Sequence, residues 1–217
     1  QRRLISSMRN RNLRVLLEVH SVEQARMGAA VDGLIVKGNE ACGWVGEETT
    51  FILLQKILHE VSLPIWAHGG IGLHSAAACY MAGAAGVVLD NQLVLTQEAS
   101  LPNTAKEALS RLDGSETVCF GTELGAPCRI FYRQNLPVIQ KIQVTLNSLV
   151  SELNSKNEAV VRWRQELFRL VGWESPEEHL WLLGQDIGFA KSLSRRFKTV
   201  GGVLRAMRNT IHDQVGS

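Results

Sequence analysis

The stretch Leu63-Pro-Ile-Trp-Ala-His-Gly-Gly-Ile71, followed by Met81-Ala-Gly-Ala-Ala-Gly-Val-Val-Leu89, decides the fold. An apolar run ends at Gly69-Gly70, a helix-length segment follows, and a second apolar run begins at Gly86. This order predicts a strand, a glycine turn, a helix and a second strand of a parallel sheet. Glycine has no Cβ, so its N–H group can approach an anion, and the helix N-terminus adds partial positive charge. The pattern therefore predicts a phosphate site at the carboxyl end of a parallel strand.

The composition is that of a globular chain with a sizeable core. Its 217 residues are 45% hydrophobic and 20% charged, and the net charge is +2. We expect no nucleic-acid partner, because the basic residues near the carboxyl end are not interleaved with aromatic ones. No leader and no membrane-length apolar run are visible, so a cytoplasmic protein without a membrane partner is expected. The four cysteines lack C-x-x-C spacing, which favours buried thiols over disulfides or metal ligands.

The first hundred residues alternate between strand and helix patterns. The strands are apolar throughout rather than alternating, which is typical of a parallel sheet covered by helices. Four such units leave a sheet open, whereas a closed barrel needs eight. We therefore expect an α/β fold, the C-terminal half of a (β/α)8 TIM barrel truncated at its N-terminus; the absence of a starting Met favours this over a small open sheet. Strands are predicted over 13–19, 31–36, 63–67 and 86–89, and helices over 21–27, 49–61 and 73–82.

The pattern changes after residue 100, so we predict two domains, 1–100 and 101–217. Two short strands are expected over 116–121 and 128–133, followed by a mostly helical region. Ser175-Pro-Glu-Glu178 has the form of a capping box with proline at the first helical position. The helices are predicted over 137–155, 157–171, 176–183 and 189–211. The first carries an apolar stripe expected to pack inside the protein: Ile139, Ile142, Leu146, Leu149 and Leu153.

Four motifs in register resemble a known family. They are Gly38-Asn-Glu-Ala-Cys-Gly-Trp-Val-Gly46 with Thr49-Thr50, the Leu63–Ile71 stretch, Gly83-Ala-Ala-Gly-Val-Val-Leu-Asp-Asn-Gln92, and Glu98-Ala-Ser100. In this order they resemble the flavin-dependent nitronate monooxygenases and, equally, the flavin-dependent enoyl-ACP reductases. The segment Gly-Trp-Val-Gly-Glu-Glu-Thr-Thr resembles the corresponding sequence of relatives associated with polyketide and polyunsaturated-fatty-acid synthases.

The resemblance implies a cofactor, a reaction type and partners. It implies an FMN-binding TIM barrel that is an oxidoreductase, with NAD(P)H as a possible reductant. The implied substrate is a small nitronate-like molecule or an acyl chain bound to a carrier protein. The implied partner within the fold is the missing N-terminal half of the barrel.

The resemblance also implies which residues hold FMN. Gly69, Gly70 and Ile71 match the first phosphate loop, and Gly43 belongs to the earlier glycine motif. Asp90 and Asn91 stand where the family has Gly-Thr in a second phosphate loop. A carboxylate near a phosphate is repulsive, so we expect either that Asp90 turns away while Asn91 donates, or that FMN binding is weakened.

Proton transfer needs a titratable group, and here the chain departs from the family. Trp44 replaces the family's histidine, and indole does not titrate near neutral pH. His68, at the end of a predicted strand, is the candidate catalytic replacement, with His20 ranked below it. Lys37 ends another strand and is expected to hold either the flavin ring or a substrate carbonyl. The role of Glu40 stays open.

Two other interpretations remain open at this level. The barrel is either an active flavin enzyme or a non-catalytic module of a synthase assembly. A phosphosugar-type barrel enzyme without flavin is the least favoured of the alternatives. A basic C-terminal helix is expected to be either a solvated face or a docking surface for an acidic carrier protein. Its residues are Lys191, Arg195, Arg196, Lys198, Arg205 and Arg208.

Overall fold

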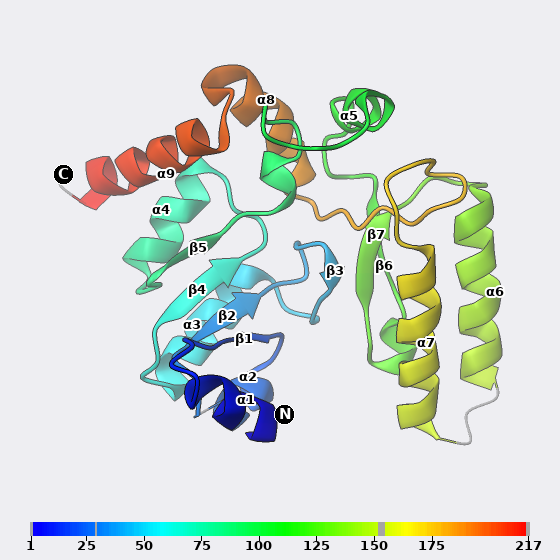
Figure 1. The fold of residues 1–217 in the computed structure, drawn as a ribbon, viewed down its shortest axis with the longest axis horizontal. Helices are drawn as coiled ribbons and strands as arrows, with labels where there is room; N and C mark the ends of the chain where they lie inside the picture. The colour runs from blue at the N-terminus through cyan, green and yellow to red at the C-terminus, as the bar shows by residue number, and fades with distance from the viewer. Residues whose placement is uncertain (1, 29, 152–154, 216–217) are drawn as a thin grey trace. The chain divides into compact units, whose positions relative to one another are not determined.

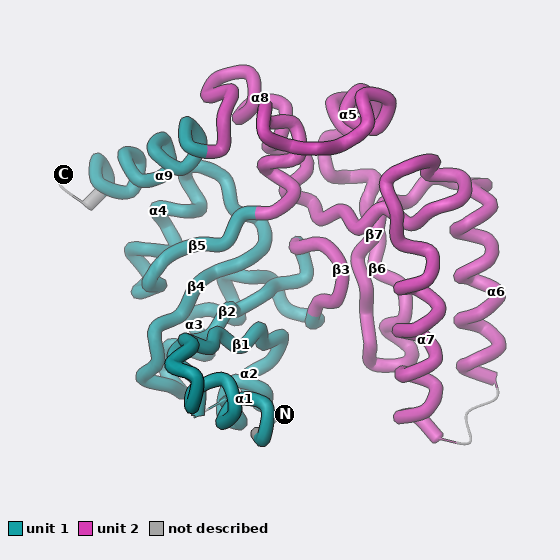
Figure 2. Tube along the Cα trace, in the orientation of Figure 1, with its two compact units in different colours: residues 1–40, 46–89, 201–217 teal, residues 41–45, 90–200 magenta. Residues whose placement is uncertain are grey.

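The computed structural model describes residues 2–28, 30–151 and 155–215. The chain forms two compact units (Figure 2), and each is described by itself. Unit 1 consists of residues 1–40, 46–89 and 201–217, and unit 2 of residues 41–45 and 90–200. The units are groups of residues that lie close together in space, so each combines separate stretches of the chain.

Unit 1 is built on a four-stranded parallel sheet (Figure 1), as the apolar strand patterns predict. The strand order is β1-β2-β4-β5, so β1 and β5 are the edges. Its strands are β1 (Leu16–Val19), β2 (Gly33–Lys37), β4 (Ile65–His68) and β5 (Gly86–Val88). Its helices are α1 (Arg2–Arg9), α2 (Val22–Met27), α3 (Thr50–Glu60), α4 (Leu73–Met81) and most of α9 (Val200–Val215). The predicted strand and helix order from residue 13 to 89 is confirmed.

The register separates the two faces of this sheet. Leu34 pairs with both Leu17 and Ile65, and a Cβ on Gly28, at the end of α2, would meet Leu17 and Leu34. This face is therefore covered by helices, and its central residues are fully buried. The opposite face carries Glu18, Ile35 and Trp66 in paired positions. The polar side chains at the ends of the strands lie on this second face.

Trp66 explains two glycines of the second face. A Cβ on Gly86 would lie 2.9 Å from Cδ1 of the Trp66 indole, and one on Gly33 would lie 2.5 Å from Cζ3. Gly86 is the register partner of Trp66, and Gly33 lies on β2, the strand on the other side. The indole therefore needs both neighbouring strands to lack a side chain beneath it.

Unit 2 combines a small antiparallel sheet with helices. The sheet has the order β3-β7-β6, where β3 is Gly43–Trp44, β6 is Thr117–Phe120 and β7 is Cys128–Phe131. The pairing of β6 with β7 confirms the predicted strand pair, whereas β3 was expected to be loop. Its remaining elements are η1 (Asn91–Leu93), α5 (Asn103–Leu109), η2 (Thr122–Leu124), α6 (Pro137–Ser151), α7 (Lys156–Leu170) and α8 (Ile187–Phe197).

The apolar stripe of α6 packs inside unit 2, as predicted. Ile139, Ile142, Leu146 and Leu149 are buried in a cluster with Trp163 of α7. Leu153 lies outside the described residues. Trp163 is fully buried, and its indole N–H donates to the carbonyl oxygen of Ala126 at 3.1 Å, which ties α7 to the loop before β7.

Two of the helix predictions are wrong. Residues 176–183 form turns and extended chain rather than a helix, because the Ser175 hydroxyl and carbonyl close a short turn on Glu177 and His179. The single helix predicted over 189–211 is two helices, α8 and α9, which are separated at Lys198. The φ of Lys198 is 63° and its ψ is −44°, a conformation outside the right-handed helical region, so a continuous helix cannot contain it.

The cysteines are free thiols of unequal exposure. Cys79 and Cys128 are buried, while Cys42 and Cys119 are partly exposed. Burial and the nearby Glu40 carboxylate raise the pKa of Cys79 to about 11, so this thiol stays protonated at neutral pH. No helix among the described residues is both long and apolar enough to cross a membrane.

Candidate active site

The glycine turn after β4 lies at the start of α4 in unit 1. Gly69 and Gly70 have φ values of 113° and 65°, which favour glycine, and Ile71 behind them is fully buried. The N–H group of Gly72 is already used by the Ser75 hydroxyl at 2.7 Å. Those of Gly69 and Gly70 donate no hydrogen bond to any other described residue. Two N–H donors at a helix N-terminus are a suitable cradle for a phosphate group.

Glu40 is linked to the end of β4 through Thr50. Its carboxylate accepts hydrogen bonds from the backbone N–H and the hydroxyl of Thr50, at 2.9 and 3.1 Å. The Thr50 hydroxyl oxygen also lies 2.9 Å from the carbonyl oxygen of His68, so its single proton is shared between these two acceptors. Glu40 therefore caps α3 and, through Thr50, fixes the end of β4.

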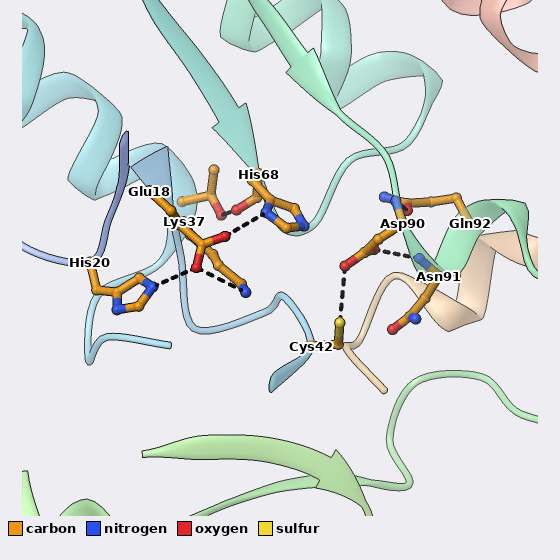
Figure 3. Close-up of polar contacts among 9 residues, drawn as sticks. Glu18, His20, Lys37, Cys42, His68, Asp90, Asn91 and Gln92 are labelled. Carbon is orange, nitrogen blue, oxygen red and sulfur yellow. Dashed lines mark hydrogen bonds and ion pairs between the residues drawn. The ribbon is translucent and has the colours of Figure 1, made fainter. Parts of the chain in front are cut away.

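Four ionisable side chains meet at the carboxyl ends of β1, β2 and β4 (Figure 3). The Glu18 carboxylate lies 3.1 Å from His20 Nε2, 3.4 Å from Lys37 Nζ and 3.9 Å from His68 Nδ1. The side chains of Lys37 and His68 are only 9% and 8% exposed. Sequence reasoning singled out the three basic residues but missed Glu18, although its i, i+2 spacing from His20 places both on one face of a strand.

The charges of this cluster act on Glu18. Burial by itself would raise the pKa of the Glu18 carboxyl, but the hydrogen bond from His20 and the positive charges of Lys37, His20 and His68 outweigh it. The net result is a pKa below the usual value of 4.5. Glu18 is therefore an anion at neutral pH, and it can hold the basic side chains in place.

Asp90 and Asn91 belong to unit 2, and their polar groups are already engaged there. The Asp90 carboxylate accepts from the backbone N–H of Asn91 and, at 3.1 Å, from the thiol of Cys42 (Figure 3). The Asn91 side chain is 4% exposed and accepts from the N–H of Gly184 at 2.6 Å. The next residue, Gln92, donates to the buried Asp186 at 2.8 Å. The N–H group expected to bind phosphate is thus paired with the Asp90 side chain, so this loop does not fit a phosphate in the conformation described.

Gly43 and Trp44 form β3 in unit 2. Gly43 has a φ of 70°, which favours glycine. The Trp44 ring lies 5.2 Å from the guanidinium carbon of Arg164, a cation–π contact. Trp44 also lines a cavity of about 490 Å3 with Cys128, Leu167, Phe168 and Leu182 among its walls. Trp44 is thus part of an apolar surface with a cation at its edge and offers no titratable group.

The fold and these sites define a class, an α/β protein with four parallel strands and a glycine turn between β4 and α4. The family model described as "Nitronate monooxygenase" matches residues 1–169. The chain belongs to the nitronate monooxygenase family, which is a family of oxidoreductases.

Individual relatives agree with this. A 5-hydroxy-7a-methyl-1-oxo-octahydro-1H-indene-4-carboxyl-CoA dehydrogenase of Rhodococcus jostii is 40% identical over 97 residues, which is 42% of this chain and 26% of that protein. FabK from Thermotoga maritima matches with a TM-score of 0.76 and 27% identity, over 97% of this chain and 64% of that one. The enoyl reductase domain of MlnA, from the macrolactin biosynthesis cluster of Bacillus amyloliquefaciens, shares the fold at 15% identity with a TM-score of 0.62, over 94% of this chain and 69% of that one.

These matches confirm the predicted family and fold class. The solved structures that the chain resembles are TIM-barrel proteins, and the parallel βα units described above match them. The chain spans 64% of the FabK chain and about a quarter of the Rhodococcus protein.

Proposed function

We propose that this protein is an FMN-dependent oxidoreductase that reduces the carbon–carbon double bond of an enoyl thioester, with NAD(P)H as the reductant. The observation that carries the flavin is the turn at Gly69 and Gly70, with two N–H donors that no described residue uses. When bound, FMN would supply hydride transfer. The chain's own residues would anchor its phosphate at the start of α4 and supply charge and protons from the Glu18 cluster.

The choice of an enoyl thioester over a nitronate rests on Trp44. Nitronate chemistry of the family type uses a histidine for proton transfer, and Trp44 stands in its place. His68 can replace that histidine as the proton-transfer group, because it is a buried imidazole at the carboxyl end of β4 beside the Glu18 carboxylate. The carboxyl-CoA dehydrogenase among the relatives, whose name is that of an enzyme of a CoA thioester, supports a thioester substrate.

The flavin proposal is tested by titrating the intact protein with FMN and following the flavin absorption and fluorescence. We expect saturable binding that Gly70→Val weakens by at least an order of magnitude, because a β-branched residue disfavours a φ of 65°. Gly201→Val, at a glycine of α9 whose Cβ would lie in ordinary contact with the Arg205 side chain at 3.5 Å, is the matched control. A parent protein that never perturbs the flavin spectrum contradicts the proposal.

A second candidate function is a non-catalytic module, and the closed loop at Asp90 favours it. The carboxylate of Asp90 occupies the N–H group of Asn91 that a phosphate would need. If the parent binds no FMN and Asp90→Gly with Asn91→Thr binds it, the module interpretation is correct. If the parent binds FMN, the Gly69-Gly70 turn alone is sufficient.

We further propose that the acyl substrate is presented by an acidic carrier protein. Lys191, Arg195, Arg196 and Lys198 of α8 and its end are all exposed, and acidic side chains are absent between Asp186 and Asp213. Such a surface attracts an acidic partner in a salt-dependent manner. Replacing Arg195 and Arg196 by Glu should raise KM for a carrier-bound enoyl substrate, most at low salt, and leave KM for a short free thioester unchanged. Equal effects on both substrates contradict carrier docking.

A further inference from the structure

We propose that Lys37 binds the carbonyl oxygen of an α,β-unsaturated thioester and stabilises the negative charge that forms on it, with His68 beside it as the proton donor. This inference rests on the proposed function and deepens it, because it names the substrate group that the Glu18 cluster recognises. It also chooses between the two roles that the sequence leaves open for Lys37, the flavin ring and a substrate carbonyl.

The hydrogen bonds of Lys37 are the first observation. Its side chain is 9% exposed, so water satisfies few of its donors. An ammonium group has three N–H donors, yet among the described residues it makes one hydrogen bond, to Glu18 at 3.4 Å. A buried charge with unfilled donors is costly unless an acceptor is supplied. A substrate oxygen is such an acceptor.

The register is the second observation. Lys37 and His68 are paired residues of β2 and β4, and paired residues of parallel strands project from the same face. The pairing of the two strands therefore places the Lys37 ammonium group and the His68 imidazole next to each other, and no loop is needed to bring them together. Sites on regular elements hold their geometry closely, which is what a charge aimed at a developing oxyanion requires.

Glu18 is a positioning residue in this arrangement. Its two carboxylate oxygens face Lys37 and His20 on one side and His68 on the other. The ammonium group of Lys37 favours an anionic oxygen over a neutral one, and Glu18 keeps the lysine in place.

The reaction balances as follows. When bound and reduced by NAD(P)H, FMN would supply a hydride to the β-carbon. The carbon–carbon π bond would break, and its electron pair would move through the α-carbon onto the thioester oxygen, to which Lys37 would donate. The carbonyl then reforms, and the α-carbon takes a proton from His68, which is reprotonated from water. The substrate gains one hydride and one proton, and NAD(P)H supplies the two electrons.

The test uses trans-cinnamoyl-CoA as a chromophoric probe bound to the oxidised intact protein, without turnover. A positive charge at the thioester oxygen draws electrons along the conjugated chain, so we expect a red shift of the probe's absorption. Lys37→Met should abolish the shift, and Lys37→Arg should retain it. Lys56→Met is the matched control, because Lys56 is an exposed lysine of α3 paired with Glu48. With reductant present, Lys37→Met should lower kcat about 10²–10³-fold, the usual cost of losing one oxyanion donor.

Persistence of the red shift in Lys37→Met overturns the proposal, as does a probe that binds the parent without shifting. If Lys37→Met keeps the shift but loses FMN, the lysine holds the flavin instead and the proposal is overturned. A parent that shifts the probe but binds no FMN supports the role of Lys37 while contradicting the proposed function. Equal far-ultraviolet circular dichroism and melting of parent, Lys37→Met and Lys37→Arg show that folding is not the cause.

Discussion

At the scale of single residues, glycine is favoured in the turn after β4 by the backbone conformation and not by a lack of room for a side chain. A Cβ on Gly70 would lie 3.6 Å from the Glu40 carboxylate, which is an ordinary contact. Its φ of 65° is nevertheless one that other residues rarely adopt. The cost of substitution at this position is therefore strain, and it can be measured apart from steric exclusion.

Gly70→Ala should lower the free energy of unfolding by about 1–2 kcal/mol, the cost of a left-handed residue with a Cβ. Gly70→Asn should cost less, because asparagine tolerates this region. Urea unfolding measures both. Gly201→Ala in α9 is the opposite case and should stabilise by about 0.5–1 kcal/mol. Similar losses at both glycines would show that strain at Gly70 is not the cause.

Glu18→Gln should make stability less dependent on pH. A lowered folded-state pKa means that the carboxylate stabilises the fold above its ordinary pKa of 4.5, and that this contribution is lost as the pH falls through the lowered value. The side chain is 41% exposed, so after screening we expect no more than about 1 kcal/mol at neutral pH. Unfolding by urea, from neutral pH down to about pH 3, should show the difference between parent and variant disappear in acid. A difference that grows in acid contradicts the assignment.

At the scale of elements, the break between α8 and α9 lies at a strained residue. Lys198 has a left-handed φ of 63°, and its carbonyl oxygen accepts a hydrogen bond from the N–H of Gln97 at 3.0 Å. The Glu98 carboxylate accepts from the N–H of Val200, at 3.0 Å to each oxygen. Two contacts from the segment before α5 thus fix the interruption. Because these contacts come from residues about 100 positions away in the chain, the helical periodicity of 189–211 does not reveal the break.

Lys198→Gly should stabilise the protein by about 1 kcal/mol, because glycine adopts this conformation without a Cβ penalty. Lys191→Gly, in the middle of α8, should destabilise it by a similar amount. Thermal unfolding of the two variants compares the same chemical change at two positions. A loss of stability at residue 198 would show that the lysine is not strained there.

The sheet of unit 1 offers a test of packing between strands. Gly86→Ala should destabilise by about 1–3 kcal/mol, because the new methyl group would lie 2.9 and 3.0 Å from two atoms of the Trp66 indole. In a Trp66→Leu background the same substitution should cost much less. The coupling energy from the double-mutant cycle, measured by urea unfolding, is the readout. Additive effects would mean that the indole does not occupy this position.

At the scale of the whole molecule, the sheet of unit 1 has two edges. In the described chain, β1 and β5 each pair on one side only. Leu16, on β1, is 44% exposed. Unpaired strand edges beside apolar side chains promote association.

Residues 1–217 produced alone should therefore self-associate and unfold over a broad temperature range. Light scattering at several concentrations and calorimetry measure the two properties. A monomer with one sharp transition contradicts the expectation. Adding about 1 M urea, below the range that unfolds most small domains, should reduce association before secondary structure is lost.

The sequence predicts local order better than it predicts breaks and partners. Apolar runs that end in glycine fix the strands and helices of unit 1, because burial and turn geometry act within a few residues. The break at Lys198 and the engaged side chains of Asp90 and Asn91 depend on residues far away in the chain, such as Gln97, Cys42 and Gly184. For the same reason His68 and Lys37 were identified one by one, while Glu18, the residue that joins them, was missed.

Trp66 restricts which substitutions could be accepted in this sheet during evolution. Its indole can be kept only while Gly33 and Gly86, on the two flanking strands, stay without side chains. Within the lineage that carries this tryptophan, the three positions should change together, and a branch that gains a larger residue at 86 should already have a smaller one at 66. Reconstructed ancestral sequences would show the order in which these substitutions occurred.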